Sequence, residues 1–195
     1  MDSETPFRAA LIAGAALVLP VAAFYRVRSQ RAGDKLDRRQ EGLPTLLTLR
    51  PAGLAAAVGL FAYMIDPASM AWASMPVPVW ARWCGVGLAA SGASLLIWTF
   101  HTLGPNLTDT VVTRRVHTLV TNGPFRWVRH PLYVATAILV LGNSLAAANW
   151  FLLAAGALVF TMMVVRTRRE EAFLIARFGD SYREYMARTG PFLPR

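Results

Sequence analysis

Cysteine, lysine and histidine are all scarce in this sequence, and each scarcity limits what the protein can be. The single cysteine, Cys84, permits no disulfide within the chain and no thiolate metal site; we expect it to be buried and inert, because it falls in an apolar run. The three histidines, His101, His117 and His130, match the spacing of no usual metal site, so we expect no metal. Lysine occurs once beside 19 arginines, and this bias, with abundant alanine, indicates GC-rich coding rather than phosphate recognition.

Acidic residues are absent from five long apolar runs, and these runs predict the fold class. They cover approximately residues 7–25, 46–65, 78–100, 132–148 and 150–165. The first three are long enough to cross the ~30 Å hydrocarbon core of a bilayer, while the last two are shorter and predict a tight helical hairpin. Five such runs in so small a chain argue against core helices of a soluble protein. We therefore predict an all-α, polytopic membrane protein with about five transmembrane helices.

The chain is long enough for one membrane domain, residues 1–195, and not comfortably for two. The first three spans occupy 1–100, and the later spans and the motifs described below occupy 101–195. The first span follows Asp2 and Glu4 rather than a basic segment, and no Ala-x-Ala cleavage context leads from it into a soluble domain. We therefore expect a retained membrane helix and not a signal peptide.

The basic residues indicate an orientation in the membrane. A net charge of +9 alone would fit a nucleic-acid binder, but 18 of the 20 basic residues lie in 26–50, 101–131 and 166–195. Only Arg8 and Arg82 fall elsewhere. These three segments share one side if the N-terminus is outside, which is the positive-inside pattern. We predict a cytoplasmic C-terminus and active site, a bacterial inner membrane as the location, and no nucleic-acid partner.

The C-terminal segment keeps helical periodicity beyond the last apolar run. Residues 166–178 place apolar side chains on one face, which predicts that the fifth span continues into the cytoplasm as a helix. Gly179 is a typical residue to end it, and Asp180 a typical N-cap for a further helical turn. Tyr182 and Tyr185 would pack that turn back toward the membrane.

Two polar clusters could carry chemistry. The first, 117–133, is a loop with glycine and proline that runs into the fourth span. Pro131 suits the first turn of a helix, and Arg129 and His130 would precede it, where free N–H groups favour an anion. A basic interfacial loop would look the same.

The second cluster contains Arg166 and Glu170, which lie four residues apart and so share a helix face. Taken alone, this spacing indicates an exposed ion pair at the end of a span.

Together the two clusters read HxLVxxGxxxxxRHPxY, followed some 35 residues later by RxxxEExxLxxxFGxxYxxY. This combination resembles the isoprenylcysteine carboxyl methyltransferase family over about residues 101–195. A wider superfamily shares the motifs, including phospholipid N-methyltransferases, thiol methyltransferases and, more distantly, sterol reductases.

The resemblance implies S-adenosylmethionine as methyl donor and a lipophilic acceptor that enters from the membrane. It places Arg166 at the acceptor carboxylate. Phe125 stands where the family pattern has tyrosine, so a hydroxyl contact is lost there. The implied cofactor-binding residues are His117, Thr118, Leu119, Val120, Phe125, His130, Pro131, Leu132, Tyr133 and Glu170.

These roles agree with the chemistry of the side chains. Glu170 can hold the cofactor's ammonium group, while His130 and the N–H groups at the start of the fourth span can hold its carboxylate. Methyl transfer to a carboxylate needs no general base, because the nucleophile is already ionised at neutral pH. It needs in-line placement and loss of water, and Arg166 can orient a carboxylate through a bidentate contact.

Three alternatives stay open. The acceptor atom could belong to a phospholipid amine or a thiol, and Arg166 favours the carboxylate only weakly. An NADPH-dependent membrane reductase would come from the distant end of the superfamily, but the chain is short for one. A non-enzymatic membrane protein is a third possibility, against which the presence of Arg166, Glu170, His130 and Tyr133 together argues. The sequence does not indicate an oligomeric state.

Overall fold

The computed structural model of the chain describes residues 3–31, 43–104 and 118–195. Within those ranges the protein is helical and contains no strand, which confirms the all-α prediction. The helices are α1 (Thr5–Arg31), α2 (Leu43–Ile65), η2 (Pro67–Ala73), α3 (Val79–Leu103), η4 (Gly123–Arg126), α4 (Pro131–Ala146), α5 (Trp150–Phe178) and α6 (Asp180–Arg188); η2 and η4 are 3-10 helices.

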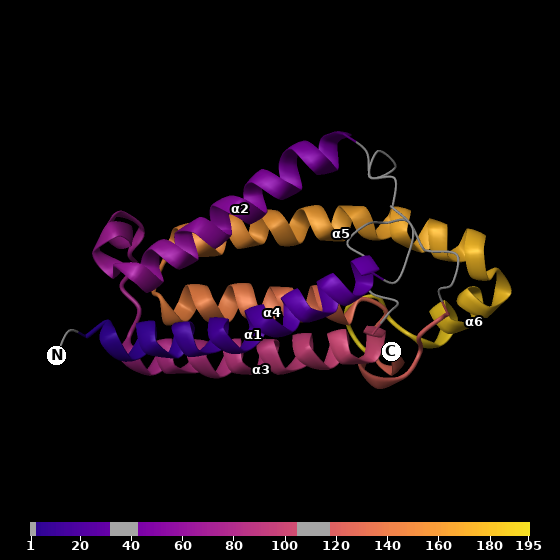
Figure 1. Cartoon of the computed structure of the whole chain (residues 1–195), viewed down its shortest axis with the longest axis horizontal. Coiled ribbons are helices and arrows are strands. Elements are labelled where there is room, and N and C mark those ends of the chain that lie inside the picture. The colour runs from indigo at the N-terminus through magenta and orange to yellow at the C-terminus, as the bar shows by residue number, and fades with distance from the viewer. Residues whose placement is uncertain (1–2, 32–42, 105–117) are drawn as a thin grey trace.

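The long helices run up and down as one bundle (Figure 1). α1, α3 and α4 lie side by side, and α2 lies along α5. One end of the bundle holds the start of α1, η2 and the turn between α4 and α5; we call it the N-terminal end. The opposite end holds the start of α4 and the short α6, and we call it the site end. The five long helices alternate in direction along the bundle.

Four of these helices, α1, α2, α3 and α5, are long and apolar enough to cross a membrane. α4 is also apolar but has 16 residues, so it rises only ~24 Å, less than the ~30 Å hydrocarbon core. The chain is thus an integral membrane protein. The predicted tight hairpin is confirmed, although α5, with 29 residues, is longer than the apolar run that predicted it. Its turn is fixed by Asn149, whose side chain accepts a hydrogen bond from Leu152 N (3.1 Å).

Small residues let α3 and α4 pack closely. A Cβ added at Gly85 would lie 2.6 Å from the backbone nitrogen of Ala146, and one at Gly142 would overlap the backbone of Ala89. Helices in lipid gain little from burying apolar side chains, because the lipid is apolar too, so close backbone approach supplies much of their association energy. The two glycines therefore fix the close packing of the second half of α4 against α3.

A buried polar network joins the helices at the N-terminal end. Arg82 makes two contacts to the Glu4 carboxylate (2.7 and 2.6 Å) and donates to the Ala146 carbonyl (2.9 Å). Tyr63 donates to the same carboxylate (2.7 Å), and the Phe7 ring lies under the guanidinium. The hydrogen bond from Arg82 lowers the pKa of Glu4, which stays ionised. Arg82 is thus tolerated at this end because its charge is compensated.

The structure corrects three details of the sequence analysis. α1 and α2 extend beyond the predicted runs, to Arg31 and back to Leu43. Asp180 is not an N-cap: Gly179, with φ of +57°, precedes α6, and the Asp180 carboxylate pairs with Arg183 instead (2.7 Å). Cys84 is exposed. The outward surface of a membrane helix is apolar because it faces lipid, so an apolar context does not imply burial in the protein. The division of the chain near residue 100 stays a prediction.

Candidate active site

The start of α4 forms one wall of the site. Pro131 is the first residue of α4, as predicted, and His130 is its N-cap. The N–H groups of Arg129 and His130 donate to the carbonyls of Gly190 (2.9 Å) and Pro191 (3.0 Å). These two N–H groups are therefore not available to an anion, because the C-terminal tail already satisfies them. That the N–H groups at the start of α4 itself favour an anion stays a prediction.

α5 supplies the facing wall through Arg166 and Glu170. Arg166 Nε lies 2.8 Å from Glu170 Oε1, and the two side chains are only 13% and 17% exposed. The same oxygen accepts a hydrogen bond from the Tyr133 hydroxyl (2.6 Å), which comes from α4. The pair is therefore buried against α4 and is not the exposed surface pair that its spacing alone indicated.

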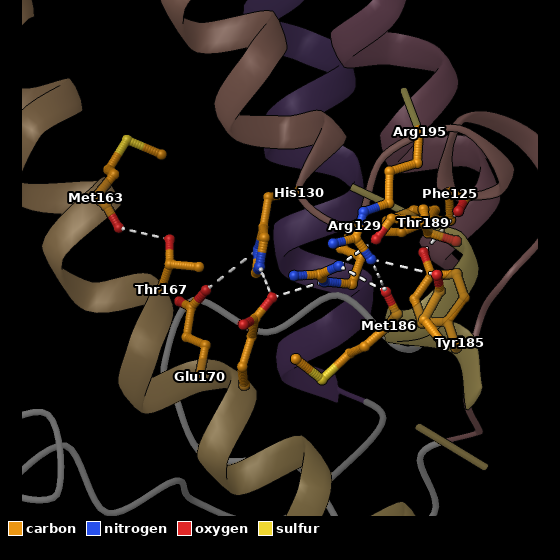
Figure 2. Close-up of polar contacts among 12 residues, drawn as sticks. Phe125, Arg129, His130, Met163, Thr167, Glu170, Tyr185, Met186, Thr189 and Arg195 are labelled. Atoms are coloured by element: carbon orange, nitrogen blue, oxygen red, sulfur yellow. Dashed lines mark hydrogen bonds and ion pairs between the residues drawn. The ribbon is translucent and has the colours of Figure 1, made fainter. Parts of the chain in front are cut away.

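His130 lies between two carboxylates. Its Nε2 is 3.2 Å from Glu171 Oε1, and its Nδ1 is 3.7 Å from Glu170 Oε2. Figure 2 shows the imidazole pointing from the start of α4 toward Glu170 on α5. The ring stacks on Tyr133, with 5.3 Å between centroids. Consecutive glutamates on α5 thus both face the residues that precede and begin α4.

Arg129 connects the site to the C-terminal tail. Its Nε donates to Glu171 Oε1 (2.7 Å), and its NH1 donates to the carbonyls of Met186 (3.3 Å) and Thr189. The sequence analysis placed Arg129 before α4 but did not predict this pairing. Glu171, the residue after Glu170, thus holds this buried guanidinium.

The tail after α6 covers the site, which no sequence motif indicated. Phe192 lies against His130 and Tyr133, with centroid distances of 5.7 and 6.4 Å. Tyr185 of α6 donates to the Phe125 carbonyl (2.6 Å). Burial raises the pKa of Tyr185 to about 12, so its phenol stays neutral and keeps this hydrogen bond at physiological pH.

The site retains capacity for a ligand. Arg166 Nε is buried and, although close to Glu170, is not in hydrogen-bonding geometry with any described partner. Glu170 Oε2 lies 3.7 Å from His130 Nδ1, too far for a hydrogen bond, so it can accept another donor. A buried unsatisfied donor beside an available carboxylate oxygen suits a ligand that carries both an anionic and a cationic group.

The other predicted cofactor-binding residues that the structure describes lie before η4, in η4 and at the start of α4. Thr118, Leu119 and Val120 lie in the coil before η4, and Phe125 lies within η4. Leu132 is in the first turn of α4. Their assignment to a cofactor pocket stays a prediction. His117 lies outside the described residues, so its assignment also stays a prediction.

A model of the phospholipid methyltransferase family matches residues 80–181, which include the start of α4 and the Arg166–Glu171 segment. The chain belongs to this family.

Individual relatives confirm the resemblance drawn from the motifs. The human protein-S-isoprenylcysteine O-methyltransferase is 32% identical over 126 residues, covering 63% of this chain and 44% of the relative. The cobalt-zinc-cadmium resistance protein CzcN of Cupriavidus metallidurans is 34% identical over 126 residues, covering 59% of this chain and 55% of the relative. The present chain thus spans about half the length of these relatives.

A solved structure shares the fold. The eukaryotic intramembrane Ras methyltransferase, isoprenylcysteine carboxyl methyltransferase, superimposes with a TM-score of 0.53 and 25% sequence identity. The match covers 74% of this chain and 51% of that protein. The family resemblance therefore extends from sequence motifs to the membrane-embedded helical architecture.

The buried Arg129–Glu171 pair predicts a large stability effect. Glu171→Ala should lower the free energy of unfolding by about 3–5 kcal/mol, because it leaves a buried guanidinium without its counterion. The two side chains are 8% and 16% exposed. Asp180→Ala is the matched control, since it breaks a pair with Arg183 that is 88% and 61% exposed and should cost at most about 1 kcal/mol. Thermal unfolding in detergent measures both, and equal losses would contradict the assignment.

Proposed function

We propose that this chain is an S-adenosylmethionine-dependent methyltransferase that transfers a methyl group to the carboxylate of a lipophilic acceptor. The observation that carries the proposal is the buried Arg166–Glu170 pair, in which Arg166 Nε lacks a hydrogen bond and Glu170 keeps an available oxygen. Membership of a methyltransferase family supports the reaction class. The relatives named for isoprenylcysteine methylation support a lipophilic acid as acceptor.

The residues present fit the cofactor. When bound, S-adenosylmethionine supplies an electrophilic methyl group on a sulfonium. Glu170 would hold the ammonium group through Oε2, and His130 would donate to the carboxylate. Tyr133 keeps Glu170 Oε1 in place through its 2.6 Å hydrogen bond. Phe192 excludes water from the His130 side of the site, which favours a reaction whose charge is dispersed in the transition state.

Arg166 would orient the acceptor. Its planar guanidinium can bind a carboxylate through two N–H groups and so fix the direction of attack. The acceptor carboxylate is ionised at neutral pH and needs no residue to remove a proton. The contribution of the protein is therefore placement and exclusion of water rather than acid–base catalysis. The acceptor would reach Arg166 from the bilayer, since α5 is one of the membrane-spanning helices.

A second candidate is methylation of a phospholipid amine, which the description of the matched family favours. An amine nucleophile must be unprotonated, so a neighbouring carboxylate would have to accept its proton. Methyl transfer to the amine creates an ammonium cation, which would then lie beside Arg166 and is electrostatically unfavourable. A reductase would instead bind NADPH. Calorimetry with S-adenosylmethionine and NADPH in parallel separates a methyltransferase from a reductase and from a non-enzymatic protein.

The orientation in the membrane follows from the distribution of charge. We propose an outside N-terminus with the site end in the cytoplasm, in a bacterial inner membrane, because 18 of 20 basic residues then lie inside. A reporter enzyme that is active only in the cytoplasm, fused after Arg195, should be active, and the same reporter before Met1 should be inactive. The opposite pattern would refute the orientation.

Glu170→Gln should weaken S-adenosylmethionine binding by at least about 30-fold, roughly 2 kcal/mol, because the amide keeps the volume but loses the charge that pairs with the ammonium group. Glu184→Gln, on the exposed face of α6, is the control and should bind normally. Calorimetry on detergent-solubilised protein measures both. Unchanged affinity in Glu170→Gln would remove Glu170 from the cofactor site.

Arg166→Lys should bind S-adenosylmethionine nearly normally but transfer the methyl group at least about tenfold more slowly, roughly 1.4 kcal/mol of barrier. Lysine keeps the charge but loses the planar fork that aligns a carboxylate. Arg168→Lys is a matched control, because Arg168 is exposed on the same helix. Initial rates with a prenylcysteine acid, compared with cofactor affinity, test this. Full turnover in Arg166→Lys would favour an amine or thiol acceptor.

A further inference from the structure

An apolar cavity lies away from the candidate active site. It measures about 470 Å³ and opens between α1 and α2 in the half of the bundle near the N-terminal end, with α3 and α4 as its floor. Ser94 and Asn143 are the polar residues among the described residues that line it; the remainder are apolar. Its volume falls in the range of sites that hold small molecules. None of the residues of the candidate active site contributes to it.

Small side chains create this cavity. The α1 wall includes Ala13 and Gly14, and the α3 floor includes Ala89 and Ala90. A Cβ added at Gly14 would meet no atom within 4 Å. α2 packs mainly along α5 and contacts α1 much less (Figure 1). A water molecule there would find few polar partners, so an apolar occupant is favoured.

Arg8 lies at the rim of the cavity. It is one turn before Leu11 on α1, and Leu11 lines the cavity. Its guanidinium donates to the carbonyls of Met64 and Ile65, the last two residues of α2. Among the described residues no carboxylate is within ion-pair distance of Arg8. By contrast, Arg82 at the same end is fully compensated by Glu4. Within the part of the chain that the structure describes, Arg8 therefore carries a positive charge without a counterion, and three of its five N–H donors have no partner there.

The dimensions match one leaflet of a bilayer. The α1 wall runs from Ala10 to Leu19, about 14 Å along the helix, and half of a ~30 Å hydrocarbon core is ~15 Å. The exposed indoles of Trp72 and Trp80 lie at the same end of the bundle, where aromatic side chains mark the interface. A guanidinium at headgroup level above an apolar cavity of leaflet depth matches the shape and charge of a phospholipid.

We propose that this cavity binds one acyl chain of a membrane phospholipid whose phosphate contacts Arg8. Arginine suits this role because its planar donors match phosphate oxygens. The phosphate would supply the counterion that Arg8 lacks. The acyl chain would fill the space between α1 and α2 and hold these two helices at a fixed separation. This site is independent of the proposed methyl transfer and lies at the opposite end of the bundle.

The acyl-chain part is tested by filling the cavity. Gly14→Leu places a side chain in the open space, and Gly87→Leu is the matched control: it makes the same change in α3, also with no atom within 4 Å, but outside the cavity. Native mass spectrometry in detergent, titrated with phosphatidylglycerol, measures binding. We expect at least about tenfold weaker binding for Gly14→Leu and unchanged binding for Gly87→Leu, because the leucine displaces buried apolar surface of the acyl chain. Equal binding by both variants would overturn the proposal.

The phosphate part is tested by substituting Arg8. Wild-type protein should prefer phosphatidylglycerol over a diacylglycerol with the same chains, Arg8→Lys should keep part of this preference, and Arg8→Gln should lose it. If Arg8 serves only to cap α2, Arg8→Gln will lower thermal stability with no change in lipid preference, and the proposal fails. A raised acceptor KM in Gly14→Leu at unchanged phospholipid binding would assign the cavity to the acceptor and would also overturn it.

Discussion

Arg129 and Glu171 meet in a buried ion pair where the segment before α4, helix α5 and the C-terminal tail come together. A guanidinium in such surroundings is tolerated only when its N–H groups have partners, because the cost of leaving one unpaired is several kcal/mol. Glu171 and two main-chain carbonyls of the α6 region supply them. The relative positions of α4 and α5, and hence of every residue in the site, depend on this contact.

The pairing also explains how two consecutive glutamates acquire different roles. Neighbouring residues on a helix point about 100° apart. Once Glu171 is directed to Arg129, Glu170 is directed to Tyr133 and Arg166. His130 lies between the two carboxylates and is positioned by both. One glutamate thus holds the structure together, while the other keeps an oxygen that a ligand can use. The arrangement needs no flexible loop to bring the groups together.

The sequence predicted the parts of this structure that depend on local pattern. The five apolar runs, the start of α4 at Pro131 and the shared face of Arg166 and Glu170 each follow from spacing within one element. Glu171 is 42 residues from Arg129 in the sequence, and Phe192 is 62 residues from His130, against which it packs. No sequence periodicity encodes contacts between residues so far apart. Burial of the Arg166–Glu170 pair was missed for the same reason, since α4 and the tail provide it. The fold supports the family assignment as a whole. The cofactor-binding roles of individual residues rest on the family resemblance alone.

The unsatisfied Arg166 Nε bears on the nature of the acceptor. Without a ligand, Glu170 is the counterion of Arg166. If the cofactor binds as we propose, the charges of its ammonium and carboxylate groups cancel, and its sulfonium makes the buried site more positive. A neutral or cationic amine would leave that imbalance in place at low dielectric, where it is costly. A carboxylate bound at Arg166 removes it. The electrostatics of the site therefore favour an anionic acceptor most strongly once the cofactor is bound, which would couple the two binding steps without any change in conformation.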